Sequence, residues 1–340
     1  MEIESQRGVN KSNRHLENPS LKKIPPWLTL LILAPLLGEL VSGHQPPLEL
    51  CNPLSVLVLM LPYGFGALVC RELIRRWKKG WLSLVLLGVA YAFYEEAIVV
   101  RSFFDPNWME LNILKPYYVL GVNWTYAEML IHFHVLVSIG ASVILAEMLY
   151  PIRREETWLG NRGLTVCIIG LALWFPAGWL MTSHVPPWPG YALSWAAIAG
   201  LILAARFVPA NFPAPVKRNA PHTLHFLLLG FINMTVFFVA VYILPEAWAP
   251  PLALSVTALI LFDALTLWLL LRWSGNGGAW DDRHRLAWVA GGLGFFIFFG
   301  FTNDAEQFAG RSCVSGLAII GLILIGIWVN RRRHEVLPSP

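Results

Sequence analysis

The sequence predicts an all-α, polytopic transmembrane helix bundle with about ten membrane-spanning helices. The 340-residue chain is 56% hydrophobic and only 14% charged, and its mean hydropathy of +0.57 lies outside the range of soluble globular domains. Its apolar residues form runs that are long enough to cross about 30 Å of hydrocarbon. Its 16 tryptophans recur near the ends of these runs, where indole rings favour the headgroup region.

The chain divides into a basic cytoplasmic tail over residues 1–26, a helix bundle over 27–330 and a C-terminal cytoplasmic tail over 331–340. The first tail has no short apolar core followed by a small-residue cleavage site, so we expect it to be retained. Ten apolar runs are expected to span the membrane: 27–42, 53–70, 81–100, 126–149, 163–181, 191–207, 223–243, 251–271, 287–301 and 312–330.

The basic residues test both the number of spans and their direction, because cytoplasmic loops are enriched in Lys and Arg. With the N-terminus inside, 22 of the 25 basic residues fall on the cytoplasmic side, and only Arg101, Lys115 and Arg311 fall outside. One missed helix would invert all later loops and remove this bias. We therefore predict a multi-pass protein of the cell membrane with both termini in the cytoplasm. The net charge of +4 follows from this loop placement and indicates no nucleic-acid partner.

The four cysteines show no spacing typical of metal ligands. Cys51 and Cys313 are expected near the same membrane face, so a disulfide between them is one alternative. Two unpaired thiols packed at helix ends is the alternative that we favour.

Residues 101–125 form the longest predicted outer loop, and this loop is rich in Trp and Tyr. Long loops in compact proteins are more often functional than short connections are. We expect this loop to fold back onto the membrane surface.

Glu95 and Glu96 stand together inside the third apolar run. Ionisable residues within membrane helices are costly, and they usually face the bundle interior or a wet cavity. Gly88, Ala92 and Glu96 recur every four residues, so a face suited to close helix packing leads to Glu96. We therefore expect Glu96 to point into the bundle.

The fourth predicted helix descends from the same side and carries Glu128, His132 and His134 at a comparable depth. Glu128 and His132 share one helical face, whereas His134 is about 200° away from His132 by the 3.6-residue period. One histidine, and not both, is therefore expected to face the paired glutamates. Glu39 closes the first span in the same outer layer.

This arrangement predicts a carboxylate oxygen of Glu95 or Glu96 within direct or one-water reach of a nitrogen of His132 or His134, beneath the loop of residues 101–125. These four residues are the candidate catalytic residues.

Two chemistries suit this set. Glu96, Glu128 and His132 are the candidate ligands of one divalent metal ion, which would lower the pKa of a bound water. The same residues without metal would act as a coupled acid and base pair. A purely structural role is the competing interpretation. In it, Glu39 and Glu128 lie in the hydrated headgroup region, Glu95 or Glu96 is neutral and hydrogen-bonded to a neighbouring helix, and His134 bonds Ser138 or a backbone carbonyl.

Three functional classes follow from these patterns. The first is a membrane-embedded hydrolase or transferase that acts on a lipid or membrane-anchored substrate at the outer leaflet. The second is a transporter whose carboxylates bind a proton or cation, and the third is a non-catalytic membrane subunit. Membrane lipid is the expected partner in each case, and the sequence leaves the oligomeric state open.

Glu95, Glu96, Arg101 and His134 resemble the paired glutamates, arginine and histidine of the CPBP intramembrane proteases, which include the CAAX prenyl endopeptidases. The resemblance implies an integral-membrane hydrolase in which a glutamate and histidines activate water. Arg101 follows Glu96 by five residues, where that family has four, and the family's Phe-x-x-x-His motif is absent. The wider pattern is more similar to that of uncharacterised prokaryotic multi-pass families.

Overall fold

The computed structural model describes residues 23–49, 52–108, 117–180, 182–212, 214, 219–275, 278–302 and 309–336. The predicted N-terminal tail up to residue 22 and Cys51 lie outside these ranges. Cys70, Cys167 and Cys313 are free thiols in the described chain, and neither alternative for Cys51 and Cys313 is tested, because Cys51 lies outside the described residues.

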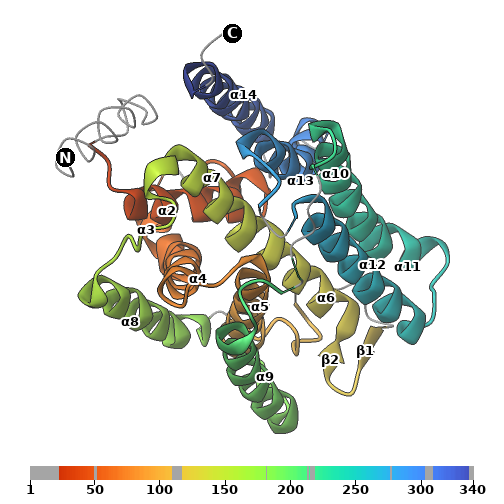
Figure 1. Ribbon diagram of the computed structural model, residues 1–340. Helices are drawn as coiled ribbons and strands as arrows, with labels where there is room; N and C mark the ends of the chain where they lie inside the picture. Colours follow the sequence, from red (N-terminus) through yellow and green to blue (C-terminus); the bar gives the residue numbers. More distant parts are fainter. Residues whose placement is uncertain are drawn as a thin grey trace.

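The described chain is almost wholly helical, which confirms the all-α prediction (Figure 1). The η9 segment is a 3-10 helix, and the other η segments are π-helical. The helical segments are α2 (Pro26–Pro35), η3 (Leu36–Val41), α3 (Pro53–Leu59), η5 (Met60–Gly64), α4 (Phe65–Arg76), α5 (Trp81–Ala92), η6 (Phe93–Val99), α6 (Trp124–Phe133), η8 (His134–Ala141), α7 (Ser142–Leu149), η9 (Pro151–Arg153), α8 (Asn161–Gly178), α9 (Trp188–Phe207), α10 (Thr223–Phe238), η10 (Val239–Ile243), α11 (Leu244–Ala247), α12 (Leu252–Trp273), α13 (Asp282–Thr302) and α14 (Arg311–Val336).

Each of the ten predicted apolar runs is helical. Eight continuous helices among the described residues are long and apolar enough to cross a membrane. The first predicted span, Pro26–Val41, is shorter than these eight. The fifth corresponds to α8, in which Asn161 and Arg162 occupy the first turn and lower the mean hydropathy.

Local chemistry explains where several helices begin. The side chain of Asn52 accepts a hydrogen bond from the Leu54 amide, and Pro53 follows as the first residue of α3. The side chain of Asn123 accepts from the Tyr126 amide at the start of α6. An asparagine at this position satisfies an amide that has no partner within the helix, and proline at the first position needs no such partner.

The helix formed by α6, η8 and α7 runs through the middle of the bundle (Figure 1). One of its faces, including Ile139 and Val143, packs in a buried cluster with α2, α4 and α5. Another face, including Val137 and Ile144, packs in a second cluster with α10 and α13. This central helix therefore joins two helix groups, and polar groups on it are shielded on both sides.

A charged network closes one end of the bundle. The carboxylate of Glu147 in α7 accepts hydrogen bonds from Arg71 and Arg75 of α4. Asp282 at the start of α13 pairs with Arg154 and Arg332. The network ties α4, α7, α13 and α14 together at the end that carries most of the basic loops.

The opposite end is covered by the loop after η6. Phe103, Phe104 and Tyr117 from this loop are buried against the bundle. The loop ends in a hairpin of two short antiparallel strands, β1 (Tyr118–Val119) and β2 (Val122–Asn123), which lead into α6. The described parts of the loop therefore pack back onto the helices, and their position relative to the membrane surface stays a prediction.

Candidate functional site

Four π-helical segments carry five of the six polar residues of one buried layer, and the sixth, Tyr91, lies in α5. Glu39 lies in η3, Tyr63 in η5, Glu95 and Glu96 in η6, and His134 begins η8. π-Helical turns are rare, and they occur mostly as short bulges within α-helices, frequently at functional sites. A π-turn holds more residues than an α-turn, so it changes which side chains face a neighbouring helix. We call Glu39, Tyr63, Tyr91, Glu95, Glu96 and His134 the polar layer.

The centre of the polar layer is a contact between Glu96 and His134. The Oε1 atom of Glu96 lies 2.9 Å from Nε2 of His134. The other imidazole nitrogen, Nδ1, lies 3.0 Å from the Ser138 hydroxyl one turn further along the same helix. The Ser102 hydroxyl donates to Oε2 of Glu96 from the covering loop. Both groups of the pair are therefore oriented by hydrogen bonds, and both are buried.

Two further carboxylates lie beside this pair. Oε1 of Glu95 accepts a hydrogen bond of 3.1 Å from the indole of Trp174 in α8. Glu39 lies within electrostatic reach of Tyr63, His134 and Glu96. Oε2 of Glu39 and Oε2 of Glu95 are both buried without a hydrogen-bond partner among the described residues. Closely spaced buried carboxylates cannot all ionise cheaply, so the layer is suited to holding and exchanging protons.

Two tyrosines complete the layer, and glycines make room for them. The ring centroid of Tyr91 lies 5.4 Å from that of His134, and the Tyr63 centroid lies 6.0 Å from it. A Cβ atom at Gly66 would lie 2.3 Å from the Tyr91 ring, and one at Gly38 would lie 2.6 Å from the Tyr63 ring. Larger residues at these glycines would displace the tyrosines that flank the imidazole.

The predicted packing face of α5 is present. A Cβ atom at Gly88 would come within 3.4 Å of the Val135 backbone, and Ala92 is fully buried. Val135 follows His134 directly, so this close approach sets the distance between Glu96 and the imidazole. The contact predicted for Glu95 or Glu96 with one histidine is thus present between Glu96 and His134, and the catalytic role of these residues remains a proposal.

His132 does not belong to the polar layer. Its Nδ1 atom lies 2.8 Å from Oδ1 of Asp263 in α12, and its ring stacks on Phe237 at 3.5 Å between centroids. Glu128 is half-buried on the same side, within electrostatic reach of Asp263. The candidate metal set of Glu96, Glu128 and His132 is therefore not assembled. The helical period explains this outcome, because His132 and His134 point in different directions from their helix and therefore face different neighbours.

No group of three or more His, Cys, Asp or Glu side chains among the described residues is arranged to hold a metal ion.

Arg101 acts on the end of α8 and not on the carboxylates. Its guanidinium donates to the carbonyls of Gly178, Trp179, Thr182 and His184. The last carbonyls of a helix have no partners within it, so this arginine satisfies the open end of α8. Its φ of +66° places the backbone in the left-handed region, which turns the chain out of η6.

Two cavities flank the polar layer. One, of about 530 Å³, lies between α4, α5, α8 and α9, and Tyr91 forms part of its wall. The other, of about 270 Å³, is lined by aromatic rings of α6, α10 and α13 and by His44, His132 and Arg311. Phe133 in its wall stands edge-on to His134, with 5.5 Å between the centroids. Each cavity is thus separated from the imidazole by one ring.

Residues 28–274 match the model of an uncharacterized membrane protein family. The chain belongs to this family. The matched region runs from α2 to the end of α12, and it contains every residue of the polar layer. No curated protein and no solved structure matched the chain.

The family match confirms the prediction of an uncharacterised multi-pass membrane protein. It gives no support to the resemblance to CPBP proteases. The structure agrees with this outcome at Arg101, whose guanidinium is occupied by the carbonyls at the end of α8.

Sequence reasoning missed Tyr63, Tyr91, Ser102 and Trp174 as members of the site. A signal existed for Tyr91, which precedes Glu95 by one helical turn and so shares its face. No local signal points to Trp174, because its contact with Glu95 joins residues 79 positions apart.

Proposed function

We propose that this protein is a membrane-embedded hydrolase or transferase that acts on a lipid or membrane-anchored substrate, with Glu96 and His134 as its acid–base pair. The observation that carries the proposal is the 2.9 Å contact of Glu96 with His134 inside a layer built from four π-helical segments. A packing role alone does not require that two helices leave α-geometry at the residues that pair.

The contacts of His134 favour proton transfer. Ser138 and Glu96 bind opposite sides of the ring, so the imidazole is held at a fixed angle. The pair would remove a proton from water or from an acceptor hydroxyl, and it would return that proton to the leaving group. Acid–base groups positioned in this way contribute about 10² to 10⁴ in rate.

A transporter is the second candidate, and a separate observation favours it. Glu39 and Glu95 each keep one buried oxygen without a hydrogen-bond partner among the described residues. Coupled transporters place carboxylates of this kind in the bundle interior, where they serve as ion-binding groups. In this reading the polar layer binds and releases protons during alternating access.

We further propose that the protein lies in the cell membrane with both termini in the cytoplasm and the polar layer near the outer leaflet. The clustering of Arg71, Arg75, Arg154 and Arg332 at one end of the bundle supports this orientation. The test is a Leu120→Cys variant in a cysteine-free background, because Leu120 is 88% exposed in the hairpin. Labelling by an impermeant thiol reagent from the cytoplasmic side alone would contradict the orientation.

The function is tested with purified protein in vesicles of total polar lipids from the expression host. Lipid products are followed by mass spectrometry for the natural chain, for Glu96→Gln and for His134→Gln. Glu155→Gln is the matched control, since its side chain is 78% exposed and distant in sequence from the layer. The enzyme proposal expects product from the natural chain and the control, and at least a 100-fold loss in the other two.

The same vesicles separate the alternatives. The transporter is favoured over the enzyme if no lipid products form and a proton gradient drives solute uptake. This uptake should be lost in the Glu96→Gln variant. Absence of both activities would favour the non-catalytic subunit and refute the proposal.

A further inference from the structure

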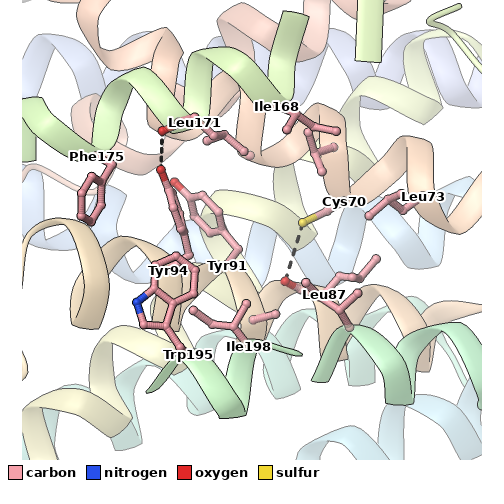
Figure 2. A pocket seen from close by; sticks show the side chains of 15 residues that line it. Cys70, Leu73, Leu87, Tyr91, Tyr94, Ile168, Leu171, Phe175, Trp195 and Ile198 are labelled. Atoms are coloured by element: carbon pink, nitrogen blue, oxygen red, sulfur yellow. Dashed lines mark hydrogen bonds between the residues drawn. The ribbon is translucent and has the colours of Figure 1, made fainter. Parts of the chain in front are cut away.

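The larger cavity is walled almost entirely by hydrocarbon. It has a volume of about 530 Å³ and lies between α4, α5, α8 and α9. Figure 2 shows Tyr91, Tyr94 and Trp195 on one side of it and Cys70 with Leu87 on the other. The Tyr94 hydroxyl donates to the Leu171 carbonyl, and the Cys70 thiol donates to the Leu87 carbonyl at 3.7 Å. Its polar atoms are thus largely engaged with the protein, and the space offers apolar contacts.

The rim of the cavity lies on the two helices that form the outer boundary of this side of the bundle. Ile168 in α8 is 49% exposed and Trp195 in α9 is 45% exposed, and both line the cavity. The α9 helix is long and apolar enough to cross a membrane, and the exposed side chains Val166, Ile169 and Leu173 of α8 are also apolar, so these exposed faces suit lipid. The medium that reaches the cavity is therefore lipid and not water.

We propose that this cavity binds one hydrocarbon chain of a membrane lipid. An apolar cavity of about 150 Å³ holds the six carbons of benzene, so a volume of about 530 Å³ corresponds to roughly 20 carbons. That is the size of one long acyl chain. A transmembrane helix of a partner is about 10 to 12 Å across, and the cavity would hold only about one turn of it.

Tyr91 connects this chain site with the polar layer. Its ring forms part of the cavity wall and lies edge-on to the imidazole of His134, with 5.4 Å between the centroids. Its hydroxyl is buried and has no hydrogen-bond partner among the described residues. A lipid chain packed against this wall would thus be separated from His134 by the Tyr91 side chain alone. The assignment of this lipid as the substrate rests on the proposed function, whereas the binding of a chain does not.

The test uses a phosphatidylcholine with a diazirine on its acyl chain, reconstituted in vesicles with the full protein. After illumination, labelled peptides are identified by mass spectrometry. Labelling is expected to be saturable and concentrated in residues 66–73, 87–94, 168–175 and 195–202. Excess unlabelled phosphatidylcholine is expected to lower it several-fold. Label that rises linearly and is spread over the exposed faces of α12 and α14 would overturn the proposal.

Two neighbouring substitutions on α8 sharpen the result. Ala172 lines the cavity, and Ala172→Trp is expected to fill its mouth and to reduce the saturable label at least fivefold. Leu173 is 62% exposed and does not line the cavity, so Leu173→Trp is the matched control and is expected to keep the label. Equal labelling of both variants would also overturn the proposal. If Ala172→Trp does not fold, the competition experiment on the natural chain decides alone.

This labelling needs no turnover, so it separates the two proposals. If the natural protein is labelled saturably but yields no lipid product, the lipid-chain site is supported and the enzyme proposal is refuted. If lipid product forms without saturable label in the cavity, the enzyme proposal is supported and the lipid-chain site is refuted.

Discussion

Replacing Glu147 by Gln tests whether buried charge pairing stabilises the basic end of the bundle. The Glu147 carboxylate accepts hydrogen bonds from Nε of Arg71 at 3.1 Å and from Nη2 of Arg75 at 2.7 and 2.8 Å. The side chain of Arg71 is fully buried and that of Glu147 is 3% exposed. Glutamine keeps the shape of the side chain and removes the charge that faces both guanidinium groups.

The expected loss of unfolding free energy depends on which partners Arg71 and Arg75 retain after the substitution. Removing one partner of a buried ion pair costs about 3 to 5 kcal/mol, because it leaves an uncompensated charge. Arg71 keeps Glu72 at 3.1 Å and stacks over Trp158 at 3.3 Å, so its loss is partly compensated. We therefore expect the lower end of the range, about 3 kcal/mol of unfolding free energy.

Glu155→Gln is the matched control, because Glu155 also pairs with Arg75, at 2.5 Å, through a side chain that is 78% exposed. An exposed pair of this kind contributes about 1 kcal/mol or less. Both variants are compared with the natural chain by denaturant titration in mixed micelles. If the two substitutions cost the same within about 0.5 kcal/mol, burial does not decide the strength of these pairs, and the reasoning is refuted.

Two further predictions concern packing and pH. A Cβ atom at Gly291 would lie 2.1 Å from the Leu227 carbonyl oxygen across the contact of α10 with α13, whereas one at Gly292 would meet nothing within 4 Å. Gly291→Ala is thus expected to cost about 3 kcal/mol and Gly292→Ala to be neutral or stabilising by up to about 1 kcal/mol in the same titration, and the reverse order would contradict this packing. Burial acts to raise the pKa of Asp281, but hydrogen bonds from the amide and ring of His284 lower it below its ordinary value. A lowered pKa adds stability that is fully present above the unfolded pKa and is lost as the pH falls through the folded pKa, so Asp281→Asn should cost less than about 1 kcal/mol at pH 7 and less still at pH 3, and a penalty that grows on acidification would show the opposite sign.

Hydrophobic runs and basic loops predicted most of the fold because both signals are local. Crossing hydrocarbon requires a run of apolar residues whatever the neighbouring helices do. The ends of the runs were less certain. Asn161 and Arg162, for example, belong to the first turn of α8, although their polarity placed them outside the predicted span.

The candidate site was predictable in part. The repeat of Gly88, Ala92 and Glu96 indicated that Glu96 points inward, and the helical period indicated that one histidine alone would reach it. The period could not tell which histidine, because it fixes the angle between His132 and His134 but not the rotation of their helix relative to Glu96. That rotation is set by how the helix packs against its neighbours.

The sequence by itself determined a multi-pass membrane protein with paired glutamates held inside the bundle, since an unpaired carboxylate in hydrocarbon is too costly to face lipid. Only the tertiary structure decided that His134 meets Glu96, that His132 turns to Asp263 and that Arg101 completes the end of α8. These outcomes depend on contacts between residues 38 to 131 positions apart. Such contacts are set by how whole helices pack, and no local pattern of residues contains that information.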